Sequence, residues 1–446
     1  MSQEGRGIAS RQGKVVFVSG ALQGETVLAL CTAVKRDYDE ALMVGLVAAT
    51  DAARERIEPD CPLYRDCGGC TLQHWSLPAQ QAHKQASLLA LLQPIAPGLA
   101  LDPPIYSSPW AYRHRLRLLV QRTPDRSYVL GMRRRGSHEA VAVSHCLVAA
   151  TPVNALLQNL PALLAAASDL QGLREIEIDC DSTGQLGLCC YFAANPGARG
   201  IALLRAALLT APVVALRVRL AAPGKPRREQ EWDDAGDDRA DWQELHAEGE
   251  LCLSLNCPGE NNDRPARVEE MAYLPGDFTQ TNWEVNNALV TRALEWLQPR
   301  SDERALDLFS GIGNFALPLA RRTAAVDALE GDAGMTRRLE ANAARNGIGN
   351  IHAKTVNLMA DGPALPRADV AIIDPPRAGA KALCEVLPRT GVSRLVYVSC
   401  HPATLARDAR LLQAAGFALV RAAAVDMFPH TGHSEAIALF ERPSKR

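Results

Sequence analysis

Cys400 has the residue type and the position that suit nucleophilic chemistry. It follows an apolar run at 395–398, which predicts a buried strand of a parallel sheet, and the segment 403–414 after Pro402 predicts a helix. Open α/β sheets form their ligand crevice at the carboxyl ends of such strands. Because a helix N-terminus favours a thiolate, we expect the pKa of Cys400 to be low. The alternative is a small buried structural thiol.

Four other cysteines have the residue type of cluster ligands. Cys61, Cys67 and Cys70 lie in one short segment, with five and two residues between them, and Cys146 lies far downstream. Two glycines between Cys67 and Cys70 allow the backbone to wrap around one centre. Four thiolates suit a [4Fe–4S] cluster or a structural zinc ion. The spacing is not the paired C-x₂-C of a zinc ribbon, so we favour iron–sulfur over zinc and over four unrelated thiols.

A glycine turn between two predicted strands indicates a nucleoside-type cofactor site. The strand 304–309 ends at Ser310-Gly-Ile-Gly-Asn314, a helix follows, and the next strand, 325–330, ends in Glu330. An acid at the tip of the second strand of a βαβ unit can hold a ribose. The turn lacks the third glycine of the dinucleotide fingerprint, which argues against NAD and leaves S-adenosylmethionine.

Two further acids lie near predicted strand ends. The strand 369–373 is followed by Asp374-Pro-Pro-Arg377, where the prolines stiffen the loop and Asp374 is expected to face the crevice. Glu435 precedes an apolar strand at 436–440, with His430 and His433 close by. On position alone we interpret Glu435 as a surface carboxylate and the two histidines as structural hydrogen-bonding residues.

The 446 residues carry a net charge of −2, so the bulk charge gives no support to nucleic-acid binding. The distribution is uneven: 112–135 holds eight arginines and one acid, whereas 229–250 holds ten acids and one base. The basic stretch could hold phosphates, and the acidic run is interpreted as a solvated, poorly ordered insertion. With no apolar run long enough for a bilayer and no signal peptide, we expect a cytoplasmic protein whose 12 cysteines are reduced.

The elements that position these residues divide the chain into three parts. Residues 1–60 predict short strands, which fit an oligonucleotide-binding type of barrel and an ordinary β-subdomain equally well. Residues 61–275 predict a helix and several strands; the first, from Tyr112, would present a row of arginines outward. Residues 276–446 predict alternating strands and helices, as in a Rossmann-like α/β sheet. The strands expected in the first two parts include 14–18, 25–30, 42–47, 174–180, 186–192 and 213–220, and the helix is 79–92.

The ordered set of motifs resembles the RNA uracil-C5 methyltransferase family over nearly the whole chain. The N-terminal segment 13–25 resembles a TRAM domain, an RNA-binding barrel. The resemblance implies a class I methyltransferase domain at 276–446, behind a central iron–sulfur domain. The motifs that carry it are the four cysteines, Phe278-Thr-Gln280-Thr-Asn282, Asp307-Leu-Phe-Ser-Gly-Ile-Gly-Asn314-Phe, Asp374-Pro-Pro-Arg, Ser399-Cys400-His-Pro-Ala-Thr and Pro429-His-Thr-Gly-His-Ser-Glu435.

The resemblance also implies roles for single residues. Cys400 is implied as the nucleophile and Glu435 as the general base, which overturns the surface interpretation of Glu435. The implied ligands of a [4Fe–4S] cluster are Cys61, Cys67, Cys70 and Cys146. The implied contacts to S-adenosyl-L-methionine are Gln280, Phe309, Asn314, Glu330, Asn357 and Asp374.

The chemistry implied for these residues is covalent. Carbon 5 of uracil is a poor nucleophile, and a thiolate that adds at carbon 6 turns the ring into an enolate that can take a methyl group at carbon 5. A general base must then remove the proton at carbon 5. The target base must leave its stack to reach a buried thiol, at a cost of roughly a few kcal/mol.

Within the family, the chain is most similar to the bacterial branch that carries both the TRAM domain and the four cysteines and methylates 23S ribosomal RNA. This implies a monomer that takes a flipped-out uracil from a single-stranded segment or loop. Two positions depart from the family pattern: His401, where Asn is usual, and Ser310, where Cys is frequent.

Three alternatives stay open. Uracil methylation could fall on another 23S site or on tRNA. Methylation of an exocyclic amine needs no thiol and usually has an aromatic residue where Arg377 lies here. A non-catalytic iron–sulfur protein that binds RNA is the alternative outside the enzymes.

Overall fold

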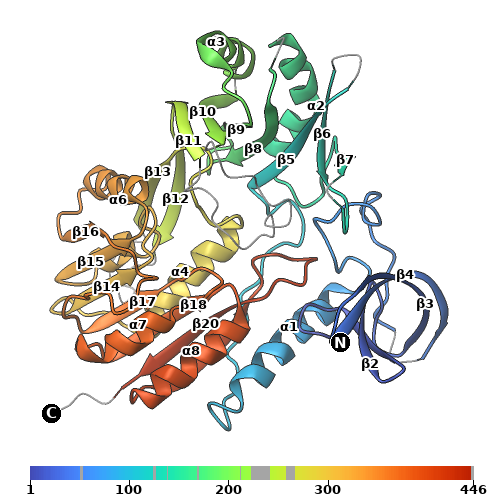
Figure 1. Ribbon diagram of the computed structural model, residues 1–446. Coiled ribbons are helices and arrows are strands. Elements are labelled where there is room, and N and C mark those ends of the chain that lie inside the picture. The colour runs from blue at the N-terminus through green and yellow to red at the C-terminus, as the bar shows by residue number, and fades with distance from the viewer. Residues whose placement is uncertain are drawn as a thin grey trace.

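The computed structural model describes residues 1–442 apart from 51–53, 124–126, 138, 168–169, 211, 222–241 and 258–266. The described residues form three larger sheets, one near each end of the chain and one between them, and a two-stranded sheet (Figure 1). Most of the acidic run, residues 229–241, lies outside the described residues, and its remainder contributes a strand. No helix in the described ranges has the length and apolar character needed to cross a membrane.

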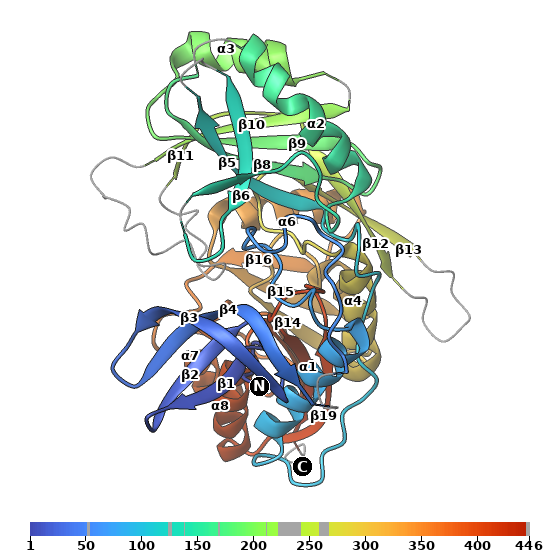
Figure 2. The same cartoon turned by 90° about the vertical axis from the view of Figure 1, so that its right-hand side faces the viewer.

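The N-terminal sheet has four strands in the order β1-β2-β4-β3 and curls around a small apolar core. Its core side chains are Val16, Val18, Ala21 and Ala41. All three strands predicted from the sequence in this part are present. The β3–β4 hairpin forms one side of this sheet (Figure 2). Leu28, Leu30 and Val44 of these two strands are exposed. The strands are β1 (Gly7–Arg11), β2 (Lys14–Ser19), β3 (Glu25–Val34) and β4 (Tyr38–Ala49).

The central sheet has seven strands in the order β11-β10-β9-β8-β5-β6-β7. Two helices, α2 and α3, cover the face whose side chains are apolar. The opposite face carries charged residues that alternate with the apolar ones along three of the strands, 115–122, 173–180 and 213–221. The elements are β5 (Arg115–Arg122), β6 (Tyr128–Arg133), β7 (Ala140–Ala142), α2 (Thr151–Ala166), β8 (Leu173–Cys180), β9 (Leu186–Phe192), α3 (Gly197–Leu208), β10 (Val213–Ala221) and β11 (Trp242–Glu248).

The arginines of β5 do not form the outward row that the alternation predicts. Arg115 is only 8% exposed, and its guanidinium pairs with Asp179 on the neighbouring strand β8. Arg117 pairs in the same way with Glu175. The prediction of a solvent-facing row is wrong here because the acids that neutralise it come from a strand about sixty residues later. Arg115 is therefore unavailable to an RNA phosphate.

The C-terminal sheet has seven strands in the order β16-β15-β14-β17-β18-β20-β19, parallel except for β20, which runs against both of its neighbours. Apolar helices cover both of its faces (Figure 1). The elements are α4 (Trp283–Leu297), β14 (Arg304–Leu308), α5 (Ala316–Ala320), β15 (Ala325–Glu330), α6 (Ala333–Arg345), β16 (Ile351–Thr355), β17 (Val370–Ile373), α7 (Lys381–Val386), a 3₁₀ turn (Leu387–Arg389), β18 (Arg394–Ser399), α8 (Pro402–Ala414), β19 (Ala418–Val425) and β20 (Glu435–Glu441).

Two earlier segments pack onto this C-terminal unit. Helix α1 (Leu77–Leu92) lies against α8 and β19, and its Leu88 and Leu92 are fully buried in the same apolar cluster. The hairpin of β12 (Leu251–Cys257) and β13 (Arg267–Tyr273) packs against α4 and α6. The core of the C-terminal unit is thus built partly by residues that precede position 276.

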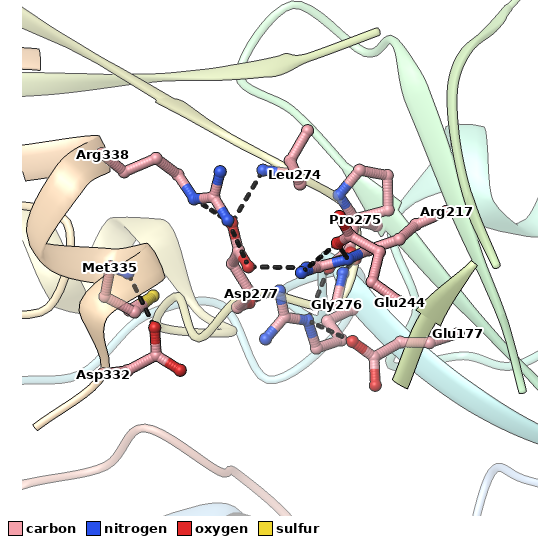
Figure 3. A network of polar contacts seen from close by, with 12 residues as sticks. Glu177, Arg217, Glu244, Leu274, Pro275, Gly276, Asp277, Asp332, Met335 and Arg338 are labelled. Atoms are coloured by element: carbon pink, nitrogen blue, oxygen red, sulfur yellow. Dashed lines mark hydrogen bonds and ion pairs between the residues drawn. The ribbon is translucent and has the colours of Figure 1, made fainter. Parts of the chain in front are cut away.

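A buried ionic network joins the central sheet to the C-terminal unit at Asp277 (Figure 3). Its carboxylate accepts from Arg217 on β10 at 2.7 Å and from Arg338 on α6 at 3.1 Å. Arg115 donates to the Asp277 carbonyl. Because breaking one partner of a buried charge pair leaves an uncompensated charge, this joint holds both units in one arrangement.

Candidate active site

A strained turn after β14 forms the floor of the cofactor side of the site. Phe309 has a φ of +66°, which a residue with a side chain rarely adopts. Its backbone N–H donates to the Leu329 carbonyl at 2.9 Å. Gly311 N–H donates to the Glu330 carboxylate at 3.0 Å, so the glycine turn and the acid at the tip of β15 meet as the sequence predicts.

The other predicted cofactor residues surround this turn. Asn314 exchanges two amide hydrogen bonds with Asn286 of α4, at 2.8 and 2.9 Å. Gln280 donates to the Asp374 carboxylate at 3.4 Å. Asn357 is exposed just after β16, where its side chain accepts from Met359 N–H. Asn357 is the exposed member of the six, and the other five are partly buried. Phe309, Glu330 and Asp374 lie at the carboxyl ends of β14, β15 and β17.

Asp307 was not singled out as a site residue from the sequence. It is fully buried within β14, and neither of its carboxylate oxygens has a hydrogen-bond partner. Burial, together with the charges of Asp374 and Glu330, raises its pKa well above the usual value. A buried polar group without a partner is rare and calls for a ligand or water. The signal available in the sequence was an acid inside an otherwise apolar strand.

The register between β18 and β20 brings Cys400 and Glu435 together. Ser399 at the end of β18 pairs with Ala436 on β20, and Cys400 and Glu435 each directly adjoin this last pair of the register. The charge of Glu435 acts on the Cys400 thiol. Asp374 follows β17, the other neighbour of β18. Three reactive side chains therefore lie at one edge of the sheet: the thiol of Cys400 and the carboxyls of Glu435 and Asp374.

Glu435 is buried, with 5% of its surface exposed, so the surface interpretation from its position is wrong. The strand β19 covers its other side, since Val425 pairs with Glu435. Burial and the charge of Asp374 raise the pKa of Glu435 to about 8, while Lys84 opposes this rise. Burial also raises the pKa of Asp374 to about 7. Near neutral pH both carboxyls can therefore carry or release a proton.

The expectation of a low pKa at Cys400 is wrong for the free protein. Burial, followed by the charges of Glu435 and Asp374, raises its pKa to about 12, and Arg377 opposes the rise. The helix N-terminus at α8 does not outweigh these effects. The N-terminal cap of helix α8 is His401, whose Nδ1 accepts a hydrogen bond from Thr404 N–H at 3.4 Å. A side chain other than the usual Asn thus still caps the helix.

We expect the reactivity of Cys400 in the free enzyme to rise about tenfold per pH unit from about pH 7 to pH 9. Its pKa lies above this range, so the thiolate fraction grows with every unit. Alkylation by iodoacetamide, followed by mass spectrometry of the Cys400 peptide, measures the rate. Glu435→Gln should accelerate alkylation most at pH 9, because Glu435, whose pKa is about 8, carries its negative charge mainly above that pH. A rate independent of pH would contradict the raised pKa.

The four predicted ligand cysteines line one small cavity of about 30 Å³. Gly68 N–H donates to the Arg133 carbonyl at 2.8 Å, and a Cβ on Gly69 would meet the Cys67 sulfur at 3.5 Å, so the loop wraps tightly around this centre. Arg135 donates to the carbonyls of Tyr64 and Cys70. Within the described ranges, no group of three or more His, Cys, Asp or Glu side chains could hold a single metal ion.

Comparison with solved structures gives the class of fold. A tRNA (uracil-54, C5)-methyltransferase of Pyrococcus abyssi, solved with S-adenosyl-L-homocysteine, matches with a TM-score of 0.72 at 21% identity, over 99% of this chain and 97% of that one. With the sheet order and the glycine turn described above, this defines the C-terminal unit as a Rossmann-like methyltransferase fold.

Sequence comparison gives the family. The profile described as tRNA (Uracil-5-)-methyltransferase matches residues 265–361 and 367–443. A protein of Hahella chejuensis named 23S rRNA (uracil(1939)-C(5))-methyltransferase RlmD is 36% identical, over 99% of this chain and 96% of its own. A protein of the same name from Pseudomonas putida is 37% identical, over 99% and 92%. The chain belongs to the RNA uracil-C5 methyltransferase family, whose members use S-adenosylmethionine.

Proposed function

We propose that this protein methylates carbon 5 of one uracil in 23S ribosomal RNA. The observation that carries the proposal is the position of Cys400 and Glu435 beside the last pair of the β18–β20 register, at the edge where the cofactor turn also lies. Exocyclic amine methylation needs neither a thiol nor a second base. The substrate class comes from the near full-length relatives, which are named for uracil 1939 of 23S rRNA.

The proposed reaction assigns one task to each group. Cys400, once ionised, forms a bond to carbon 6 of the uracil, and carbon 5 gains the electron pair. S-adenosylmethionine would supply the methyl group, from its sulfonium sulfur, to carbon 5. Glu435 then takes the proton from carbon 5. The electron pair of the broken carbon–hydrogen bond restores the double bond between carbons 5 and 6, and the bond between carbon 6 and the Cys400 sulfur breaks. Asp374, bonded to Gln280, is placed to orient the base or the cofactor end.

The residues of the glycine turn fit an S-adenosylmethionine site. Glu330 is suited to the ribose, because its carboxylate lies at the tip of β15 beside Gly311. The orphaned carboxyl of Asp307 offers a buried polar group toward the same turn. Gln280, Phe309, Asn314, Asn357 and Asp374 are proposed as the remaining contacts.

We also propose that Cys61, Cys67, Cys70 and Cys146 hold a [4Fe–4S] cluster. In such a cluster each thiolate binds a different iron, so the sulfurs surround a shared centre and need not converge on one ion. Four cysteines around a common cavity support this arrangement. The cluster has no redox step in the proposed reaction, and its proposed role is to stabilise the structure or to shape the bound RNA.

Protein purified without oxygen should contain about four irons and four acid-labile sulfides per chain. Cys67→Ser should lower both contents and the charge-transfer absorbance, because it removes one ligand. Cys252→Ser, which changes a cysteine far from the cavity, serves as the matched control and should leave all three unchanged. Stoichiometric zinc without sulfide in the unaltered protein would contradict the proposal.

The organisation proposed from the sequence has three parts: 1–60 as a TRAM-like RNA-binding barrel, 61–275 as the iron–sulfur domain and 276–446 as the methyltransferase domain. The curled four-stranded sheet at 7–49 supports a barrel-type first part. We propose that the protein acts as a monomer on a flipped-out uracil. Its proposed location is the cytoplasm, where ribosomal RNA is found.

A strain that lacks this protein tests the substrate. Methyluridine at the 23S position named in the relatives should disappear from its ribosomal RNA and return when the gene is restored. Mapping methyluridine in tRNA and in the rest of 23S rRNA from the same samples tests the alternative uracil substrates. Loss of methyluridine from tRNA alone, with 23S rRNA unaffected, would overturn the ribosomal assignment.

A further inference from the structure

Lys84 is a buried cation that has no task in the reaction described above. It lies on α1, and only 3% of its surface is exposed. Its ammonium donates to the Asp426 carboxylate at 2.7 Å and to the Phe428 carbonyl at 3.2 Å. The side chain of Asp426 is 2% exposed, and its second oxygen has no partner. Burying such a pair costs desolvation energy, which a surface pair avoids.

The position of this pair connects it to Glu435. Asp426 directly follows Val425, the residue of β19 that pairs with Glu435 on β20. Asp426 and Phe428 lie in the first part of the loop 426–434, which leads from β19 to Glu435. Lys84 therefore fastens the first residues of this loop, and its charge reaches Glu435 through buried surroundings, where screening by water is weak.

The charged groups that act on Glu435 come from the elements around it. Asp374 at the end of β17 and Asp426 at the end of β19 raise its pKa. Cys400 lies at the end of β18. Among the described groups that act on Glu435, Lys84 is the cation, and it lowers the pKa. Without Lys84, the charges that act on the pKa of Glu435 would be those of two carboxyls, Asp374 and Asp426.

We infer that Lys84 is a positioning residue for the proposed general base: it anchors the β19–β20 loop and keeps Glu435 able to exist as a carboxylate when the carbon-5 proton must be removed. This inference rests on the proposed role of Glu435. It adds a contribution from α1, a helix outside the methyltransferase domain, to the proton-transfer step.

The test measures loss of the carbon-5 hydrogen directly. The substrate is 23S rRNA transcribed with [5-³H]uridine, and tritium released to water is followed between about pH 6 and pH 9. Lys84→Met should move the midpoint of the pH profile upward by about one unit, a tenfold loss of release below it. Asp426→Asn should move it downward, because it removes an opposing negative charge. Lys84→Arg should retain the wild-type midpoint.

A purely structural role for Lys84 would lower the amount of folded enzyme without moving any midpoint, and that result would overturn the inference. If Lys84→Met does not fold, the double variant Lys84→Met/Asp426→Asn removes both charges, and Asp426→Asn alone still decides the question by its shift. Glu435→Gln separates the two proposals. Normal tritium release in Glu435→Gln would refute the base itself, whereas blocked release combined with unshifted Lys84 and Asp426 variants would refute only the inference.

Discussion

Replacing Cys400 by alanine is expected to abolish methyl transfer, with a loss of more than about 10⁴-fold in turnover. Without the sulfur, carbon 5 of the uracil receives no electron density from addition at carbon 6. The cofactor turn and the RNA-binding parts remain intact, so binding of S-adenosylmethionine should be within about twofold of the wild type. Methyl incorporation into ribosomal RNA from unmodified cells measures the first effect, and calorimetry measures the second.

RNA that contains 5-fluorouracil tests directly whether Cys400 forms a covalent bond to the base. Carbon 5 then carries fluorine, which a base cannot remove as a proton, so the adduct between enzyme and RNA persists after methyl transfer. Wild-type protein should form a band that resists denaturation, and Cys400→Ala should not. Cys252→Ala is the matched control, since this cysteine lies on β12, away from the site, and should retain the adduct. A wild-type enzyme without any adduct would refute covalent catalysis.

Glu435→Gln is expected to stop the reaction after the methyl group has been transferred. The amide has nearly the shape of the carboxyl but takes no proton, so turnover should fall by about 10²–10⁴-fold. Ordinary, unfluorinated RNA should then accumulate as a methylated covalent adduct. A denaturing gel with methyl-labelled cofactor detects both the adduct and its methyl group.

The strand that carries Glu435 provides the control for this variant. Glu441 lies at the other end of β20 and is exposed, so Glu441→Gln changes the same residue type without touching the site. Its turnover should match that of the wild type. If Glu435→Gln turned over normally, the base would have to be another group, and Asp374, whose pKa is also raised by burial, would be the next to replace.

Local patterns predicted most of the C-terminal sheet. The apolar run before Cys400 is β18, the proline after it starts α8, and the acid of the second strand meets the glycine turn. These features depend on residues close together in sequence, so propensity and periodicity suffice to predict them.

The electrostatics of the site depended on contacts that the sequence does not display. Cys400 was expected to have a low pKa because it precedes a helix, yet burial raises its pKa, and Glu435, from a strand 35 positions later, raises it further. Burial of Glu435 follows from the β19 and β20 pairings, and neutralisation of Arg115 follows from β8. Pairing partners between distant strands have no local signature.

The packing of α1 has a consequence for how the chain is made. Lys84 and Asp426 are 342 residues apart, and Leu88 and Leu92 of the same helix pack in the core of the C-terminal unit. A chain emerging from the ribosome exposes α1 long before its partners α8 and β19 have been synthesised. The N-terminal sheet can fold early, whereas the helix next to it must wait for the last strands. Truncation near the C-terminus should therefore leave an apolar helix face uncovered near the start of the chain, a feature that chaperones and proteases recognise.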